Sequence, residues 1–302
     1  MKIAVIGLGK MGHQIATKLH VSGHQVYGVV RRQEQADELA LEGLTVTTSM
    51  SDVMPFFDGD QAVIWLMIPA DAVDAEIDSW LKVLPAGSIL IDGGNSDYRK
   101  TKERADRIEA KSIHFLDIGT SGGVHGITTG FSMMIGGSAP AYTIVEPIVE
   151  ELAKPSGAYQ YFGESGTGHY VKMVHNAIEY GMMQSLAEGY RMLEEGAFPG
   201  KINLADAGEV WQHGSVVTSW LNELTRQTVK ENPTLEGIEG YVAESGEARW
   251  TLETAHELGI PLPAIQTAFD VRIKSQQGET NFATKLLAAM RNKFGGHTIN
   301  KL

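Results

Sequence analysis

The first half of the chain alternates short apolar runs with segments of helical periodicity. Five runs rich in Val and Ile read as buried strands: KIAVIG, QVYGVV, AVIWLM, SILIDG and IHFLDIG. Residues 11–21 and 71–84 lie between such runs and read as helices. This rhythm predicts βαβ units that form a parallel sheet with helices on both faces. FSMMIGG and AYQYFGE are further strand candidates.

Strand signals nearly vanish after about Gly166. The remainder reads as long helices broken by the loops FPGK, ENPTLEG and LGIPLPA. The sequence therefore predicts an α/β domain over residues 1–165 and an all-α domain over residues 166–302.

Composition excludes several classes of protein. A net charge of -12 disfavours nucleic-acid binding, because phosphate contacts need clustered Lys and Arg. The absence of cysteine excludes disulfides, thiolate nucleophiles and Cys-ligated metals. No apolar run approaches the ~20 residues that span a bilayer, and the N-terminus leads directly into a strand pattern. We expect a cytoplasmic protein with neither a membrane nor a nucleic acid as partner.

GLGKMG, with Gly7, Gly9 and Gly12, follows the first strand directly and opens a helix. In this context the first two glycines permit a tight turn and the approach of a pyrophosphate, and the third permits close packing of helix on strand. The anion would lie on free N–H groups at the helix N-terminus. We predict a dinucleotide site in an N-terminal Rossmann-type, doubly wound domain. A tight turn without ligand is the alternative.

The end of the second strand bears on the choice of dinucleotide. An Asp or Glu here would bind the ribose 2′-hydroxyl of NAD, but the chain has Val30 followed by Arg31 and Arg32. Two guanidinium groups can bind a 2′-phosphate, which favours NADP over NAD. An exposed arginine pair at the start of the next helix is the alternative.

Two loops follow strands in the second half of the predicted sheet. DGGNS contains Asn95, whose amide can contact both nicotinamide and substrate. DIGTSGG contains Ser121, Gly122 and Gly123, which offer a hydroxyl and unhindered backbone N–H groups for a carboxylate. Loops beyond the strand C-termini form the ligand crevice of a doubly wound sheet. The same residues are also common in ordinary turns.

The segment GHYVKMVHNAIEYG reads as a helix with Lys172, Asn176 and Glu179 on one face. Hydride transfer from an alcohol needs a base for the hydroxyl proton, and lysine can serve. Glu179, two turns further on, could donate a proton. The alternative is an exposed charged stripe.

These four motifs together resemble 6-phosphogluconate dehydrogenase, a family of the β-hydroxyacid dehydrogenases. The resemblance runs from Met1 almost to Leu302 and is to the short form, which lacks a second helical repeat. It implies oxidative decarboxylation of 6-phospho-D-gluconate to D-ribulose 5-phosphate and CO₂ in the pentose phosphate pathway. The cofactor would be NADP or NAD, with no metal.

The resemblance also implies roles for individual residues. Lys172 would take the proton of the 3-hydroxyl, and Glu179 would protonate C1 of the enediol. The implied substrate site consists of Asn95, Ser121, Gly122, Gly123, His175, Asn176, Tyr180, Arg272, Arg291 and His297. The expected cofactor site consists of Gly7, Leu8, Gly9, Lys10, Met11, Gly12, Arg31, Arg32, Met67, Ile68 and Asn95.

The tail RNKFGGHT matches a family segment that places Arg291 and His297 in the phosphate site of a neighbouring subunit. The resemblance therefore implies a homodimer or homotetramer with a shared active site. The preceding helix carries an apolar stripe that could pack on a partner or in its own core, formed by Phe282, Leu286, Met290 and Phe294. One departure is SGEARW, where Ser245 replaces the first lysine of the long-form pattern.

Two other functions stay open. A dehydrogenase for a small unphosphorylated β-hydroxyacid would not need Arg272, Arg291 and His297 together. A non-enzymatic dinucleotide-binding redox sensor would not need Lys172 and Glu179 on one face.

Overall fold

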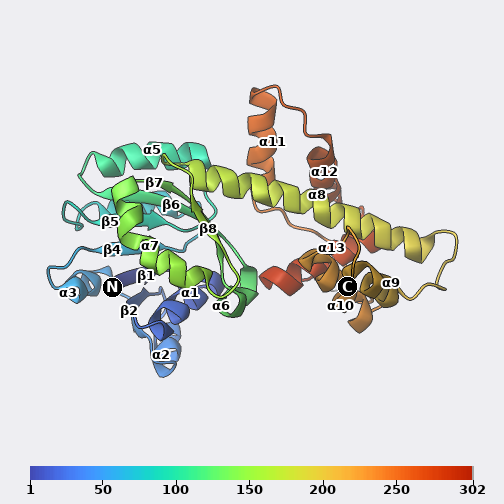
Figure 1. Ribbon diagram of the computed structural model, residues 1–302, viewed down its shortest axis with the longest axis horizontal. Helices are drawn as coiled ribbons and strands as arrows, with labels where there is room; N and C mark the ends of the chain where they lie inside the picture. Colours follow the sequence, from blue (N-terminus) through green and yellow to red (C-terminus); the bar gives the residue numbers. More distant parts are fainter. Residues whose placement is uncertain (301–302) are drawn as a thin grey trace. The chain divides into compact units, whose positions relative to one another are not determined.

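The computed structural model describes residues 1–300 and divides into two compact units, residues 1–173 and residues 174 onward (Figure 1). The division falls inside the long helix α8 (Thr167–Glu195). The boundary predicted from sequence, between residues 165 and 166, lies in the loop before this helix and stays a prediction. No helix of residues 1–300 is long and apolar enough to cross a membrane.

The first unit contains one eight-stranded sheet in the order β3-β2-β1-β4-β5-β6-β7-β8. The strands are β1 (Lys2–Ile6), β2 (Gln25–Val29), β3 (Thr45–Thr47), β4 (Val63–Leu66), β5 (Ile89–Asp92), β6 (His114–Ser121), β7 (Ser132–Gly137) and β8 (Tyr159–Tyr161). All seven predicted strands are present, and β3 is an additional short one. The order reverses between β1 and β4, which is where a doubly wound sheet binds its ligand.

One strand pair departs from the predicted parallel sheet. β7 runs antiparallel to β6, with Gly119 opposite Met134. The connection covers only residues 122–131, which is shorter than the dozen or so residues that a parallel crossover needs. The following strand, β8, is parallel to β7 and is reached through a helix.

Helices cover both faces of the sheet (Figure 1). They are α1 (Lys10–Val21), α2 (Gln33–Leu41), α3 (Val53–Phe57), α4 (Val73–Trp80), α5 (Tyr98–Glu109), α6 (Gly126–Thr129) and α7 (Ala139–Ala153), with 3-10 turns η1 (Met50–Asp52) and η2 (Gly123–His125). The predicted helix over residues 71–84 is shorter, because both ends are turns.

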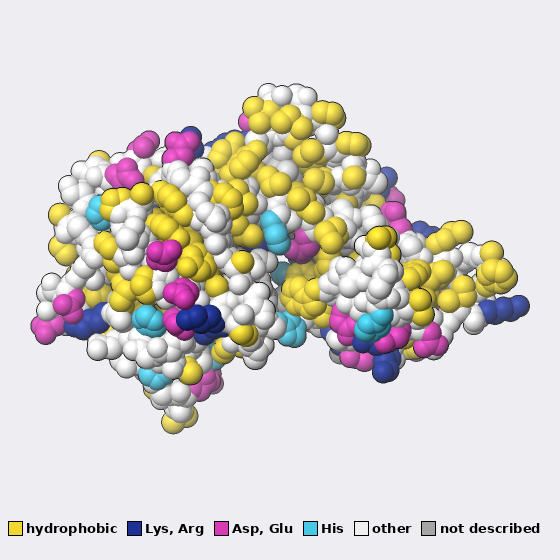
Figure 2. All heavy atoms as spheres, viewed as in Figure 1, with side chains coloured by type: hydrophobic (Ala, Val, Ile, Leu, Met, Phe, Trp, Pro, Cys, Tyr) yellow, Lys and Arg dark blue, Asp and Glu magenta, His cyan; other side chains and the backbone are white. Residues whose placement is uncertain are grey.

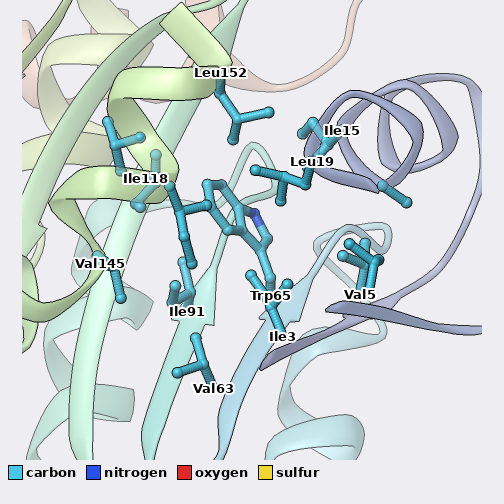
Figure 3. Packing of buried hydrophobic residues seen from close by; sticks show 14 of the residues in the cluster. Ile3, Val5, Ile15, Leu19, Val63, Trp65, Ile91, Ile118, Val145 and Leu152 are labelled. Carbon is cyan, nitrogen blue, oxygen red and sulfur yellow. The ribbon is translucent and has the colours of Figure 1, made fainter. Parts of the chain in front are cut away.

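Successive side chains of a strand point to opposite faces of the sheet, so each face has its own hydrophobic core. In β1, Ile3 and Val5 join the cluster beneath α1 and α7, while Ala4 and Ile6 join the cluster beneath α4 and α5. Trp65 of β4 is fully buried in the first cluster and packs among aliphatic side chains from the sheet and helices (Figure 3).

Within residues 174–300, the second unit contains the rest of α8 and five further helices. These are α9 (Leu204–Gln212), α10 (Trp220–Glu231), α11 (Glu247–Glu257), α12 (Pro263–Gln276) and α13 (Phe282–Gly295). Phe282, Leu286 and Met290 of α13 are buried in the core of this unit, and Phe294 packs against it. The apolar stripe of α13 is therefore a core stripe within the chain.

Candidate functional site

The glycine turn joins β1 to α1 and leaves space for a ligand. Gly7 has a φ of +91°, and a side chain there would press on the carbonyl oxygen of Met67 at 2.6 Å and on Ile68 at 2.7 Å. A Cβ on Gly9 would meet nothing within 4 Å. Gly9 caps α1 without a side-chain hydrogen bond, and the first turn of α1 has no acidic residue. An anion at this helix N-terminus fits these features.

The remaining predicted cofactor residues differ in exposure. Leu8 is 3% exposed and belongs to the core, so only its backbone could contact a ligand. Lys10 is exposed and Met11 is partly buried. Arg31 and Arg32 are exposed directly after β2, while Val30 before them is buried.

The two predicted substrate loops follow β5 and β6, which are neighbours in the sheet. Asn95 is exposed, and its loop is fixed by buried Asp92, which accepts bonds from Gly94 N and Ser96 Oγ. Gly122 and Gly123 both have positive φ, +133° and +53°, which strains other residues. Ser121 is the last residue of β6.

The first turn of α8 lies directly on the backbone of β6 and β7. Asp117 of β6 is fully buried, and its carboxylate accepts bonds from the N–H groups of Gly166, at 2.8 Å, and His169, at 2.9 Å. Burial raises the pKa of Asp117, while His169 and these two N–H groups act in the opposite direction. Glycines permit this close approach: a Cβ on Gly168 would lie 2.6 Å from the Met134 carbonyl oxygen.

Lys172 extends from this turn over Gly119 of β6. A Cβ on Gly119 would lie 2.7 Å from Lys172 Cγ, so the absence of a side chain creates the space for the lysine. Lys172 is 5% exposed, which rules out the alternative of a solvated charged stripe at this position. Lys172 is therefore a buried candidate for a proton acceptor.

Further along α8, in the second unit, Tyr180 and two arginines form a cluster. The Arg272 guanidinium carbon lies 3.2 Å from the centre of the Tyr180 ring. Arg272 is 2% exposed and Arg291 is 7% exposed. Burial lowers the pKa of Arg272 to about 10, and the charge of Arg291 contributes to the decrease. Burial also lowers the pKa of Arg291, against the opposing influence of Tyr180 and Glu179.

Other predicted residues lie around this cluster or apart from it. His175 Nδ1 lies 2.9 Å from Asn176 Oδ1, and Asn176 is buried. Glu179 is partly buried. His297 follows α13 and contacts the ring of Phe294. It is exposed, whereas Arg291 is buried.

Three residues that hold α8, Lys172 or Asn176 in place were not predicted from the sequence: Asp117, Gly119 and Glu247. Asp117 and Gly119 lie inside the quoted DIGTSGG motif, but only the packing of α8 reveals their contacts. Glu247 lies 71 residues from Asn176, to which its carboxylate is bonded, and no local pattern signals such a pair.

A separate groove of about 760 Å³ lies in the second unit, between the middle of α8 and residues 216–219. Its lining contains none of the predicted site residues. Hydrophobic side chains reach the surface of this unit, as Figure 2 shows in yellow, and Met182 and Trp220 are nearly half exposed.

Two family models match the chain. The model described as the NAD binding domain of 6-phosphogluconate dehydrogenase matches residues 2–165. The model described as the 6-phosphogluconate dehydrogenase C-terminal domain matches residues 168–301.

Three relatives of known name carry the name of the same family as these models. A Bacillus subtilis protein is 39% identical over the whole of both chains, and its name assigns 6-phosphogluconate dehydrogenase activity provisionally. A Haloferax volcanii protein, named as NAD(+)-dependent decarboxylating 6-phosphogluconate dehydrogenase, is 36% identical over 99% of this chain and 98% of its own. The decarboxylating enzyme of Lactococcus lactis strain IL1403 is 34% identical over 97% of this chain but only 65% of its own.

Solved structures agree at the level of the fold. The Plasmodium falciparum 6-phosphogluconate dehydrogenase aligns with a TM-score of 0.83 and 28% identity over 96% of this chain and 70% of its own. A 3-hydroxyisobutyrate dehydrogenase from Salmonella typhimurium aligns with a TM-score of 0.76 and 20% identity over 95% and 99% of the two chains. From these matches, the chain belongs to the 6-phosphogluconate dehydrogenase family.

Proposed function

We propose that the chain catalyses oxidative decarboxylation of 6-phosphogluconate to ribulose 5-phosphate and CO₂, with reduction of NADP or NAD. The observation that carries the proposal is the pair of buried arginines, Arg272 and Arg291, beside Tyr180. Neither guanidinium forms an ion pair with a carboxylate of residues 1–300. A buried cation without a counter-ion costs several kcal/mol, so the pair favours an anionic ligand such as a phosphate.

Lys172 is proposed as the base of the oxidation. It is buried against Gly119, and as the neutral amine it would accept the proton of the substrate 3-hydroxyl. A bound nicotinamide would supply the acceptor for the hydride. The protonated lysine would then stabilise the oxygen of the ketone while the β-keto acid loses CO₂, a charge effect that needs no metal.

Glu179 is proposed as the acid that protonates C1 of the enediol. It stands two turns after Lys172 on the same helix, about 10 Å along the axis. Asn95, Ser121, Gly122, Gly123, His175 and Asn176 are proposed to bind the carboxylate and hydroxyl groups. Tyr180, Arg272, Arg291 and His297 are proposed for the phosphate.

NADP is the proposed preferred dinucleotide. Arg31 and Arg32 are exposed at the carboxyl end of β2, and neither pairs with a carboxylate in the described part of the chain. They can therefore bind a 2′-phosphate without breaking an existing ion pair. The Haloferax volcanii relative is named as NAD(+)-dependent, so both dinucleotides belong in the assay.

We also propose a homodimer or homotetramer with a shared active site, to which the tail residue His297 would contribute. Arg291 is buried beside Arg272 and Tyr180 of its own chain, which contradicts the expectation that it serves a neighbouring subunit. Exposed apolar side chains on the second unit, including Met182 and Trp220, support self-association. Light scattering across a dilution series measures the mass. A monomer with full activity at every concentration would contradict the shared site.

The direct test mixes pure protein with 6-phosphogluconate and each dinucleotide and follows absorbance of the reduced nicotinamide. Gluconate and hydroxyisobutyrate are the matched substrates without phosphate. Turnover confined to 6-phosphogluconate supports the proposal, whereas turnover of hydroxyisobutyrate alone supports the unphosphorylated-acid enzyme. Dinucleotide binding without any turnover supports the redox sensor.

An arginine variant tests the phosphate site within the same assay. Arg272→Met should raise KM for 6-phosphogluconate by about 10- to 100-fold through loss of a charge-assisted contact. Arg191→Met is the control, because Arg191 is a partly exposed arginine of α8 that pairs with Glu195. Equal KM values for the two variants would remove Arg272 from substrate binding.

A further inference from the structure

We propose that Glu247 is a positioning residue that fixes the amide of Asn176 and, through it, the tautomer of His175. The inference rests on the proposed function in so far as His175 and Asn176 contact the substrate. It concerns a residue inside the SGEARW segment to which no role was assigned from the sequence.

Glu247 uses both carboxylate oxygens within the second unit. It lies in the first turn of α11 and is 2% exposed. Its Oε1 accepts a hydrogen bond from Asn176 Nδ2 at 3.0 Å, and its Oε2 accepts one from Ser245 Oγ at 2.6 Å. The carboxylate therefore joins α11 to α8 at the position of a predicted substrate residue.

The direction of these bonds determines the state of the neighbouring imidazole. An ionised carboxylate can only accept, so it selects the orientation in which Asn176 presents its NH₂ group. The amide oxygen of Asn176 then faces His175 Nδ1 at 2.9 Å. Because that oxygen is an acceptor, Nδ1 must carry a proton. In the neutral imidazole Nε2 is then the hydrogen-bond acceptor, suited to a substrate hydroxyl.

A buried carboxylate costs desolvation free energy that a neutral side chain would avoid. What the carboxylate provides in return is a group that only accepts hydrogen bonds. Glu247 forms no ion pair within residues 1–300, although its charge acts on Arg291. A glutamine would fill the same volume with a smaller desolvation cost. A glutamine side chain can both donate and accept, however, so it would allow either orientation of Asn176.

The same segment contacts a third predicted substrate residue. The backbone N–H of Ser245 donates to Tyr180 Oη at 3.3 Å. Ser245 therefore connects Glu247 to Tyr180, whose ring faces Arg272. His175, Asn176 and Tyr180 are thus oriented by one short segment that begins α11.

The first measurement uses the wild-type protein. Long-range ¹H–¹⁵N correlation spectra at pH 8 report which imidazole nitrogen of His175 carries the proton, with His175→Gln as the assignment control. We expect the Nδ1–H tautomer. An Nε2–H tautomer in the wild type overturns the inference, whatever the activity of the protein.

The second measurement uses Glu247→Gln in the full chain. We expect mixed tautomers of His175 and a KM for 6-phosphogluconate raised about 10- to 100-fold, with KM for the dinucleotide within about twofold of wild type. Glu247→Asp should restore part of the loss, because it keeps an acceptor-only group. Glu253→Gln is the matched control, since Glu253 is an exposed glutamate of the same helix α11.

The outcomes separate this inference from the proposed function. Wild-type protein that does not oxidise 6-phosphogluconate contradicts the proposed function, and the tautomer of His175 still decides the role of Glu247. An active wild type together with a Glu247→Gln variant of unchanged KM and unchanged tautomer contradicts the inference alone.

Discussion

The contact between Gly119 and Lys172 makes a quantitative prediction for Gly119→Ala. A Cβ at this position would lie 2.7 Å from Lys172 Cγ and closer still to its Cβ. Carbon atoms pack best at about 3.5–4.0 Å, so Cγ of the lysine must retreat by about 0.8–1.3 Å and its Cβ by more. Neither side can yield easily, because Gly119 is paired in the sheet and the first turn of α8 is bonded to Asp117.

A displacement of about 1 Å at a reacting group costs about 100-fold in rate, so kcat should fall by this factor. The extra methyl group should destabilise the protein by about 1–3 kcal/mol and lower Tm by about 2–4 °C for each kcal/mol. Steady-state kinetics and thermal melting measure the two effects. Titration of protein fluorescence with the dinucleotide should give an unchanged Kd.

Gly189→Ala is the control for this variant. It lies in the same helix, and a Cβ there would meet nothing within 4 Å, so kcat should not change. The reasoning would be refuted if Gly119→Ala kept kcat within about threefold of wild type. A lower Tm alone would show only that the strand and helix pack tightly.

Three further predictions concern other parts of the chain. Lys172→Met should abolish turnover while dinucleotide binding, followed by fluorescence, survives; retained turnover would remove the lysine from the mechanism. Changing Arg31 and Arg32 to Ala should raise KM for NADP much more than for NAD, and equal effects would count against a 2′-phosphate site. The hydrogen bond from Arg104 lowers the pKa of Asp74 below its usual 3.8, so the folded state favours the ionised carboxylate. This stabilisation is present above pH 3.8 and is lost as the pH falls through the folded pKa. Asp74→Asn should therefore lower Tm at pH 7, and the difference from wild type should shrink as the pH is lowered below 3.8; a difference that stays constant as the pH falls would contradict this linkage.

Much of the first unit could be predicted from local patterns. The apolar runs identified β1, β2, β4, β5 and β6 from their Val and Ile, β7 from its Met and Ile, and β8 from its two tyrosines, because each run can be read without its neighbours. β3 was not predicted, since its sequence TVT contains a single apolar residue. The antiparallel pairing of β7 also required the structure, because strand direction depends on the length and path of the connection.

The candidate site divides in the same way. GLGKMG predicted a turn in which Gly7 adopts a positive φ and approaches the backbone of Met67. The helix that carries Lys172 and Glu179 was evident from its periodicity. Whether Lys172 was buried or solvated could not be decided from that periodicity, because burial depends on Gly119, which is 53 positions away in the sequence. The α13 stripe was equally ambiguous until the structure placed it in the core of its own unit.

The sequence by itself determined which residue types stand at each turn, strand end and helix face, since those depend on short-range geometry. Only the tertiary structure decided which of these groups are desolvated and which distant partner orients them. Asp117 beneath α8 and Glu247 beside Asn176 are examples, because hydrogen bonds between residues about 50 and 70 positions apart follow from the packing of whole elements.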